Sequence, residues 1–316
     1  MHSTCSCAGP GCGTVSAARD SVALVISVVV VNWNAGPALV RCLASLDADA
    51  AAGTDVVVVE NGGDDGSTVL ATRDRPWVRV VETSGNLGFA RGANAGAAAA
   101  RGEVLVFVNP DATIEPGALR GLVEALTLAP GAAIAGGGLR DDDGGWQPAA
   151  ARFGVLAHLV LDTTPGRLAA RGRRDAHIVD WVYGTFMAVR REVFDTLGGF
   201  DGAYFLYGED LDLCYRARVA GWRTLYVPGA VARHARNVSA TTRFGLARDA
   251  AVVQGELRFY ARRRGLGVAV LYRTVATIKF GVKALVATLG RRPTTARRAA
   301  LVVRVCLGQR AEDLAC

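Results

Sequence analysis

The stretch Ala23–Val31, ALVISVVVV, decides the fold of this 316-residue chain. Apart from Ser27 it is an uninterrupted apolar run, and most of its residues are β-branched. Such a run is typical of a central parallel strand that is buried on both faces. It follows Arg19 as the apolar part of a signal peptide would, but it ends in Asn32-Trp33-Asn34 and not in a small-residue cleavage site. We therefore expect a buried strand.

Strands and helices alternate after this first strand. Asp55–Val59 and Val104–Val108 are further buried runs, and Trp77–Val81 predicts a strand between them. The segments that separate or follow these strands read as helices: Ala38–Leu46, the small-residue stretch that ends at Ala100, and Pro116–Leu128. The alternation predicts an α/β fold with an open, mostly parallel sheet flanked by helices.

The second half of the chain is harder to interpret. A strand is expected at Ala132–Gly136, and the glycine-rich segment Gly137–Gly145 after it predicts a mobile loop. Another strand is expected at Arg223–Val227, and His234 stands seven residues beyond it.

Polar side chains follow four successive predicted strands. They are Asn32, Asn34, Glu60, Asn61, Asn86 and Asp111. Each loop alone is explained by turn chemistry. Their coincidence favours a ligand site, because ligands of parallel sheets bind outside the carboxyl ends of the strands. No G-x-G-x-x-G follows the first strand and no Gly-Lys-Ser/Thr follows any strand, which argues against a dinucleotide or a P-loop nucleotide.

The segment Gly198–Trp222 combines acids, aromatics and a helix start. Glu209, Asp210 and Asp212 follow a glycine, as acids do at the positive end of a helix dipole. Helical spacing pairs Asp212 with Arg216. The same spacing leaves Asp210 without a partner on its own helix, so its role is open to a functional interpretation.

The net charge of +7 is unevenly distributed. From Leu257 to the end, thirteen Lys and Arg stand against two acids, which gives +11 and leaves −4 for the rest. A basic tail suits an anionic membrane surface or a phosphate-bearing partner. Nucleic acid is not expected as a partner, because the tail lacks interleaved aromatics and no nucleic-acid-binding motif is present.

The spacing of the seven cysteines fits no disulfide framework. Those in the leader, residues 1–20, do not fit a metal site. We expect the leader to be disordered. Free thiols are typical of a reducing cytoplasm.

The order of motifs resembles the family 2 glycosyltransferases of the GT-A fold, and more narrowly their bacterial rhamnosyltransferase-like branch. The resemblance covers roughly residues 26–239. The motifs that carry it are Val29–Asn34, Val59-Glu60-Asn61-Gly62, Asn86–Ala90 with Asn94, Val108-Asn109-Pro110-Asp111, Gly184-Thr185-Phe186, Gly199-Phe200-Asp201 and Glu209–Leu213. Individually they are weak signals, but their order and spacing are specific.

The resemblance implies an inverting enzyme that moves a sugar from a nucleoside diphosphate to an acceptor hydroxyl. The donor would be a dTDP-deoxyhexose such as rhamnose, and the acceptor a lipid-linked cell-envelope glycan. The leaving diphosphate needs Mg²⁺ or Mn²⁺ held by carboxylate, and the hydroxyl needs a general base. By the family pattern Asp210 is the base, and Glu209 supports it or positions the acceptor.

The same resemblance assigns the binding residues. Asp111 would hold the metal, and His234 would be a further ligand. The alternative is a structural role, which is the more common one for a lone histidine. Asn109 departs from the family pattern, which has an acid there, so the metal site carries less negative charge. Glu60 stands where the family has an aspartate against the nucleobase. Acceptor contacts are expected at Gly184 and Thr185, and nucleotide-sugar contacts at Asn32, Asn34, Glu60, Asn61, Asn86, Gly88, Phe89, Asn94, Asn109 and Asp111.

We expect three parts after the leader: a nucleotide-sugar half at about 21–137, an acceptor half at about 138–240, and a helical, basic, membrane-associating extension at 241–316. Val268–Leu289 is long and apolar, but Arg273, Lys279 and Lys283 interrupt it. This favours an interfacial helix over a membrane span or ordinary core packing. The expected location is the inner face of the cell membrane.

Two other hypotheses are weighed. A sugar-phosphate nucleotidyltransferase would want a glycine-rich loop with a basic residue after the first strand, which Asn32–Pro37 lacks. A non-catalytic nucleotide-sugar-binding scaffold at the membrane is suggested by Asn109 and Glu60. The presence of four other residues argues against it: Asp111, Glu209, Asp210 and His234.

Overall fold

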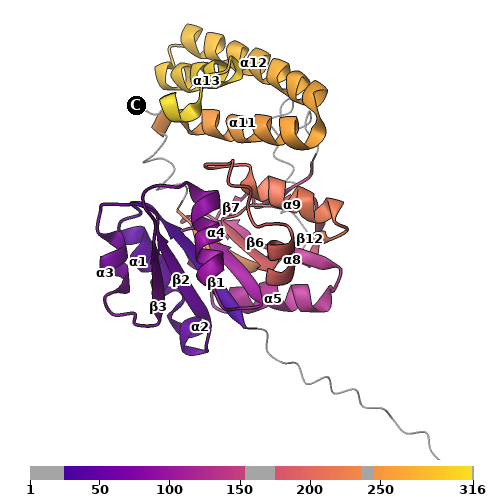
Figure 1. Ribbon diagram of the computed structural model, residues 1–316. Coiled ribbons are helices and arrows are strands. Elements are labelled where there is room, and N and C mark those ends of the chain that lie inside the picture. The colour runs from indigo at the N-terminus through magenta and orange to yellow at the C-terminus, as the bar shows by residue number, and fades with distance from the viewer. Residues whose placement is uncertain (1–24, 154–174, 236–244, 315–316) are drawn as a thin grey trace, which may run out of the picture.

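The computed structural model describes residues 25–153, 175–235 and 245–314, so the predicted leader lies outside the described residues (Figure 1). The strands are β1 (Ile26–Asn32), β2 (Asp55–Glu60), β3 (Val78–Glu82), β4 (Val104–Val108), β5 (Ala112–Ile114), β6 (Ala132–Arg140), β7 (Trp146–Gln147), β8 (Ala150–Ala151), β9 (His177–Val179), β10 (Trp181–Val182), β11 (Phe186–Arg190) and β12 (Arg223–His234). The helices are α1 (Pro37–Ala44), α2 (Asp47–Ala51), α3 (Ser67–Thr72), α4 (Phe89–Ala99), α5 (Ala118–Leu128), α8 (Arg191–Thr196), α9 (Glu209–Val219), α11 (Arg248–Phe259), α12 (Leu266–Leu289) and α13 (Pro293–Cys306).

The main path of the central sheet has the order β3-β2-β1-β4-β11-β6-β12-β5. β3, β2, β1 and β4 are parallel, and so are β6 and β12. β11 lies between β4 and β6 and is antiparallel to both. The predicted α/β fold with a mostly parallel sheet flanked by helices is confirmed, with an antiparallel strand at its centre.

The direction of the chain reverses after β3. From β1 to β3 it moves toward one edge of the sheet, and from β3 it returns across to β4. Because parallel crossovers are right-handed, α4 must pack on the opposite face from α1 and α3. α4 contacts β1 and β2, and Figure 1 shows it crossing in front of the sheet. The reversal lies between β1 and β4, and sheets of this kind bind ligands at the carboxyl ends of the two strands that flank such a point.

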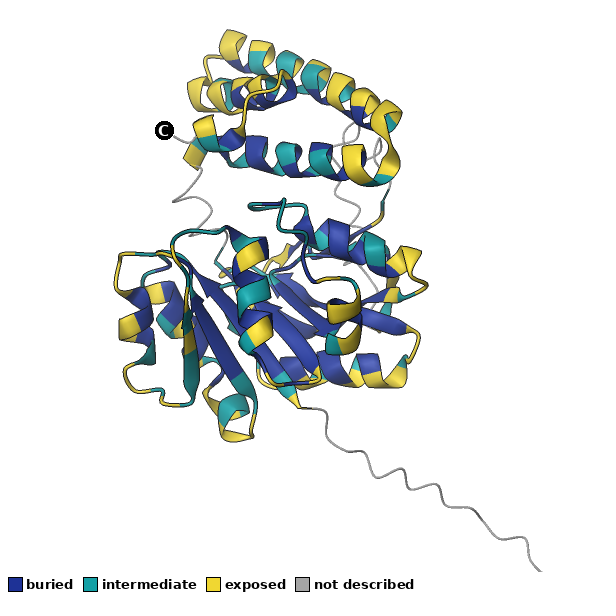
Figure 2. Ribbon diagram, in the orientation of Figure 1, coloured by how far each residue is buried: buried dark blue, intermediate teal, exposed yellow. Residues whose placement is uncertain are grey.

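Valine runs form the core of the sheet. Val28–Val31, Val56–Val59 and Val104–Val108 are all buried, as Figure 2 shows for the strands between the helices. Each buried valine contributes about 1.5–3 kcal/mol relative to an exposed one. β-Branched side chains also fit the pleated surface well. These runs therefore fix which segments become central strands.

The predicted mobile loop Gly137–Gly145 is wrong in its first part. β6 continues to Arg140, and Gly137 and Gly138 pair with β12. A Cβ on Gly137 would lie 2.3 Å from Phe186 Cδ1 and 2.5 Å from the Ala230 carbonyl oxygen. These glycines serve close packing within the sheet. The rest is a tight turn, in which Asp141 Oδ1 accepts a 2.6 Å hydrogen bond from the Gly145 amide.

The predicted end of the strand at Val227 is also wrong. β12 passes through an irregularity between Val227 and Val231 and ends at His234. The Pro228-Gly229 pair, which usually terminates a strand, lies within this irregularity. His234 therefore lies on a strand that is paired with β5, beside Ala112.

A second apolar cluster joins the C-terminal helices to the sheet domain. It contains Phe259 and Tyr272 of the helical part, and Leu211 of α9. Figure 1 shows α11 running above α9, with α12 farthest from the sheet. Among the described residues, none of the helices has the length and apolarity that crossing a membrane requires, and this includes α12.

Candidate active site

The turn before α9 has an unusual backbone. Tyr207 has a φ of 69° and Gly208 a φ of 92°. Glycine adopts this region freely, whereas for tyrosine it is strained by about 1–3 kcal/mol. The turn delivers Glu209, Asp210 and Asp212 in the first turn of the helix, and Arg216 and Arg218 lie in the last turn. The charges at both ends of α9 suit its dipole.

Asp210 is held by two backbone amides. Its Oδ2 accepts a 2.9 Å hydrogen bond from Gly184, and its Oδ1 accepts a 2.7 Å hydrogen bond from Leu211. Burial raises the pKa of Asp210 above its ordinary value, although these amides oppose the shift. Each carboxylate oxygen has two lone pairs, so each retains capacity to accept a further proton donor.

Glu209 is buried beside Asp210. Burial raises its pKa well above the ordinary value, and the Asp210 carboxylate raises it further. Within the part of the chain that the structure describes, Glu209 Oε2 has no hydrogen-bond partner. A buried carboxyl group with a raised pKa and a free oxygen is typical of a functional site.

The predicted acceptor residues bridge the two halves of the site. The amide of Gly184 binds Asp210, and the carbonyl of Thr185 accepts a 3.0 Å hydrogen bond from the Asn109 amide at the end of β4. Phe89 also lies beside Gly184, since a Cβ there would be 3.7 Å from the Phe89 ring. The predicted motifs that contain Asn109, Phe89 and Asp210 thus meet at Gly184-Thr185.

The structure also brings Asp111 and His234 together. His234 Nε2 lies 3.3 Å from Asp111 Oδ1, and both side chains are buried. His234 Nδ1 lies 3.1 Å from Gln147 Oε1, whose amide nitrogen donates a 2.7 Å hydrogen bond to the His234 carbonyl. Since Gln147 Oε1 can only accept, Nδ1 donates in this contact, and in the neutral imidazole the lone pair is then on Nε2.

This pair fits a divalent cation. Nε2 makes no hydrogen bond to any described residue, although it lies against the Asp111 carboxylate. An imidazole nitrogen 3.3 Å from a carboxylate oxygen, with the other ring nitrogen held by Gln147, matches part of a metal-ligand set. The described residues contain no cluster of three or more His, Cys, Asp or Glu side chains suited to a metal, so further ligands would come from elsewhere.

Cys42 contacts the loop Asn109–Asp111 and is not a metal ligand. Its Sγ donates to the Asn109 carbonyl at 3.6 Å. Burial, helped by the nearby Asp111 carboxylate, raises the pKa of the Cys42 thiol to about 12. A neutral thiol does not bind metal strongly. Cys42, Cys214 and Cys306 are free and buried.

Asp111 and one acid of α9, Glu209, both act on the Tyr207 phenol. Burial raises the pKa of Tyr207, and the carboxylates of Glu209 and Asp111 both raise it further. The start of α9 and the end of β4 therefore lie within electrostatic range of each other. Glu209 and Asp111, which are far apart in the sequence, thus lie near the same side chain.

At the end of β1 and β2 the predicted residues form a polar network. Buried Asn32 donates to Glu60 Oε2 at 3.1 Å, and Glu60 Oε1 accepts a 2.8 Å hydrogen bond from the Gly63 amide. Asn34, with a φ of 49°, accepts from the Asp64 amide at 2.9 Å. Burial opposes a low pKa for Asp65, but hydrogen bonds from Ser67 and Gly36 lower it. These hydrogen bonds hold a loop that carries several carboxylates, among them Asp64 and Asp65.

Asn61 and Asn86 shape the next loop. Asn61 Oδ1 accepts a 3.1 Å hydrogen bond from the Leu87 amide, and Asn86 Oδ1 accepts a 3.0 Å hydrogen bond from the Gly88 amide. Gly88 has a φ of 79°, and a Cβ there would lie 2.3 Å from the Phe205 carbonyl oxygen. Only glycine permits this approach, which joins the loop to the segment before α9.

Asn94 faces another motif. Its amide nitrogen donates to the Phe200 carbonyl at 2.8 Å, and its Oδ1 accepts from the Phe200 amide at 2.9 Å. A nucleotide contact for Asn94 stays a prediction. Sequence reasoning missed Gln147, which lies on a two-residue strand, and Tyr183, whose pKa is raised by burial and by Asp210. Neither carries a periodic signal.

Comparison with known proteins agrees with this geometry. Residues 23–251 match the model of the family described as "Glycosyltransferase like family 2". The N-acetylglucosaminyl-diphospho-decaprenol L-rhamnosyltransferase of Mycobacterium tuberculosis is 34% identical over 233 residues, which are 66% of this chain and 76% of that protein. The rhamnosyltransferase WbbL of Escherichia coli is 51% identical over 57 residues, 18% of this chain and 22% of that protein.

Two solved structures share the fold. A mannosyltransferase from Pyrobaculum calidifontis, solved with GDP-Man and Mn²⁺, has a TM-score of 0.56 and 18% identity over 90% of this chain and 87% of that one. GalNAc-T7, solved with UDP, GalNAc and Mn²⁺, has a TM-score of 0.55 and 19% identity over 78% of this chain, which spans about half (51%) of that structure. Together with the match over residues 23–251, these findings show that the chain belongs to the family 2 glycosyltransferases, with a GT-A fold.

Proposed function

We propose that this glycosyltransferase moves rhamnose from dTDP-rhamnose to a hydroxyl of a lipid-linked cell-envelope glycan, with inversion at the anomeric carbon. The observation that carries the proposal is the link through Gly184 and Thr185: the Gly184 amide binds Asp210, and the Thr185 carbonyl accepts from Asn109, two residues before the Asp111 that lies beside His234. The printed name of the M. tuberculosis relative, an L-rhamnosyltransferase acting on N-acetylglucosaminyl-diphospho-decaprenol, supports the sugar and the lipid-linked acceptor.

Asp210 would act as the general base. The acceptor oxygen forms a bond to the anomeric carbon while the bond from that carbon to the diphosphate oxygen breaks, and the hydroxyl proton passes to Asp210. Its raised pKa makes it a better base than an exposed aspartate. The amides of Gly184 and Leu211 fix the orientation of the carboxylate, which reduces the entropy that the reaction must lose.

Asp111 Oδ1 and His234 Nε2 would hold Mg²⁺ or Mn²⁺, which neutralises charge on the leaving diphosphate when bound. Gln147 would keep the imidazole in the tautomer whose Nε2 lone pair can bind the metal. With Asn109 in place of an acid, the protein offers one carboxylate at this loop. The diphosphate oxygens would complete the ligand set, so metal binding should depend on the nucleotide.

The carboxyl ends of β1 to β4 would hold the nucleotide sugar. This follows the expected division into a nucleotide-sugar half at 21–137 and an acceptor half at 138–240. Asn32 Oδ1 is buried without a partner among the described residues, and it lies in the network of Glu60. An unpaired acceptor at the carboxyl end of β1 suits a donor group of the ligand. The Asn86–Phe89 loop would close over the sugar from the side of Gly184.

The C-terminal extension would dock on the inner face of the membrane. One side of α12 exposes a row of apolar side chains: Leu271, Ile278, Val282, Leu285, Val286 and Leu289. Figure 2 shows exposed residues along α12, on the side of the helical part that faces away from the sheet. Lys279 and Lys283 flank the row, and Arg291-Arg292 and Arg297-Arg298 follow it. An apolar stripe bordered by cations fits the headgroup region of an anionic bilayer.

Nucleoside diphosphate release tests the function. The full chain is incubated with dTDP-rhamnose, UDP-N-acetylglucosamine or GDP-mannose, with a polyprenyl-diphosphate N-acetylglucosamine acceptor, and with Mn²⁺, Mg²⁺ or a chelator. We expect metal-dependent release of dTDP together with a rhamnosylated lipid. Binding of all donors without transfer would contradict the proposal, and transfer from another donor alone would replace the sugar.

A further inference from the structure

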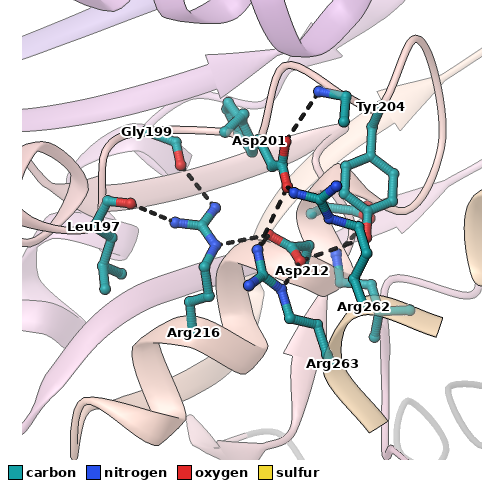
Figure 3. A network of polar contacts seen from close by, with 12 residues as sticks. Leu197, Gly199, Asp201, Tyr204, Asp212, Arg216, Arg262 and Arg263 are labelled. Carbon is teal, nitrogen blue, oxygen red and sulfur yellow. Dashed lines mark hydrogen bonds and ion pairs between the residues drawn. The ribbon is translucent and has the colours of Figure 1, made fainter. Parts of the chain in front are cut away.

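Asp212 lies in the first turn of α9, two residues after the proposed base, and it is fully buried. Two arginines share its carboxylate. Arg216 of the same helix donates to Oδ2 at 2.6 Å, and Arg263 donates to Oδ1 at 2.6 Å from the segment that follows α11 (Figure 3). The second partner is 51 residues away in the chain. A buried carboxylate therefore ties the catalytic helix to the C-terminal helices.

The two arginines have different further contacts. Arg216 donates to the carbonyls of Leu197 and Gly199, each at 2.7 Å, and so it fixes α9 to the segment before it. Arg263 also lies 3.4 Å from Asp201 Oδ2. It is thus the group that connects α9, the Gly199-Phe200-Asp201 motif and the C-terminal helices, as Figure 3 shows.

The strained turn before α9 is held from the same side. Gly255 of α11 packs on it so closely that a Cβ there would lie 2.2 Å from the Tyr207 carbonyl oxygen. Arg248 of α11 donates to the Tyr207 hydroxyl at 3.3 Å. Glycine is unfavourable inside a helix, so its place at 255 is explained by this approach.

The charges on α9 make such support necessary. Glu209, Asp210 and Asp212 share one helical turn, and no side chain caps the helix. Like charges at this spacing repel one another and favour water over a buried site. Arg263 places a cation against the third acid, while Gly255 and Arg248 hold the backbone that leads into the first two.

We propose that Arg263 and Gly255 are positioning residues for the transfer reaction: the C-terminal helices hold the first turn of α9, and with it Asp210, in the geometry that accepts the proton. The proposal rests on the role proposed above for Asp210. It assigns the C-terminal segment a direct part in turnover, separate from membrane docking.

The first test compares neighbouring arginines in the full chain. Arg262 contacts Asp201 but not Asp212, so Arg262→Ala is the matched control for Arg263→Ala. A small displacement of a catalytic group costs up to about 100-fold in rate, so we expect Arg263→Ala to lower kcat by about 10- to 100-fold. The KM for the nucleotide sugar should stay within about twofold, because uniform binding is not touched. Arg263→Lys should recover part of kcat, since a lysine supplies the charge without the fork.

The second test changes no charge. Gly255→Ala inserts one methyl group against the Tyr207 carbonyl, whereas Gly121→Ala in α5 adds a methyl 3.6 Å from its nearest neighbour, an ordinary contact. We expect Gly255→Ala to lower kcat and Gly121→Ala to leave it unchanged. If Arg263→Ala does not fold, Gly255→Ala still tests the proposal.

Two outcomes would overturn the proposal. One is a kcat for both Arg263→Ala and Gly255→Ala that equals that of the controls. The other is a parallel loss of donor affinity, melting temperature and turnover, which would make both residues structural only. Asp210→Asn in the same assay separates this from the function itself: if that variant still transfers sugar, the proposed base is wrong whatever Arg263→Ala does.

Discussion

The amide of Gly184 donates a 2.9 Å hydrogen bond to Asp210 Oδ2, joining the segment after β10 to the first turn of α9. Asn can keep this contact as an acceptor but cannot take a proton. Asp210→Asn should therefore lower kcat by about 10²- to 10⁴-fold, the usual contribution of a general base. Nucleotide binding, measured by calorimetry, should not change, because the proposed donor contacts lie at the ends of β1 to β4. Asp180→Asn, which loses the salt bridge to Arg218 and alters the hydrogen bond from the Phe153 amide, is the control.

The same variant should make the protein more stable at neutral pH. The pKa of Asp210 is raised in the folded state, so folding favours the protonated form. Stability from this group is present below the pKa of the unfolded chain and is lost as pH rises through the folded pKa. Replacing the buried charge removes that loss and outweighs the one backbone contact, from Gly184 or Leu211, that the Asn amide nitrogen cannot accept. The gain should disappear at low pH; equal or lower Tm at both pH values would contradict it.

How far the sequence predicts this molecule depends on the kind of signal. β1, β2 and β4 were predicted because unbroken valine runs have one physical explanation, burial on both faces. The ranges predicted for β6 and β12 were too short. Glycine and proline indicate flexibility in a sequence even where they serve packing, as at Gly137. Gln147 and Arg263 were missed since each acts on a residue distant in the chain, His234 or Asp212, and no local pattern encodes such a contact.

The Asp111–His234 pair predicts a metal requirement that involves Gln147. Gln147→Ala removes the group that fixes the imidazole and should weaken Mn²⁺ binding by about 10- to 100-fold in the presence of the nucleotide. His234→Ala should weaken it more. Titration of Mn²⁺ followed by electron paramagnetic resonance measures free metal directly. His177→Ala, on β9, should bind Mn²⁺ as the wild type does, and equal affinities throughout would exclude this pair as the site.

The apolar row of α12 predicts binding to anionic vesicles. Val282→Asp with Leu285→Asp introduces two charges on the face proposed to enter the headgroups, so co-sedimentation with phosphatidylcholine–phosphatidylglycerol vesicles should be lost. Val69 on α3 is also exposed, and Val69→Asp should bind as before. Binding should weaken as salt rises, because the cations that flank the row are screened. Unchanged sedimentation of the double variant would contradict this surface.

Packing around Gly137 predicts a stability effect that tests the corrected course of β6. A methyl group at 137 would meet the buried Phe186 ring at 2.3 Å and the Ala230 carbonyl at 2.5 Å. Phe186 is fully buried, so its ring has no space into which it can move. Gly137→Ala should therefore lower the free energy of unfolding by about 1–3 kcal/mol, as overpacked cores do. Gly131, one residue before β6, has open space at its Cβ, and Gly131→Ala should change it by less than about 0.5 kcal/mol. Urea unfolding measures both, and an equal midpoint for the two variants would mean that residue 137 lies in a flexible loop after all.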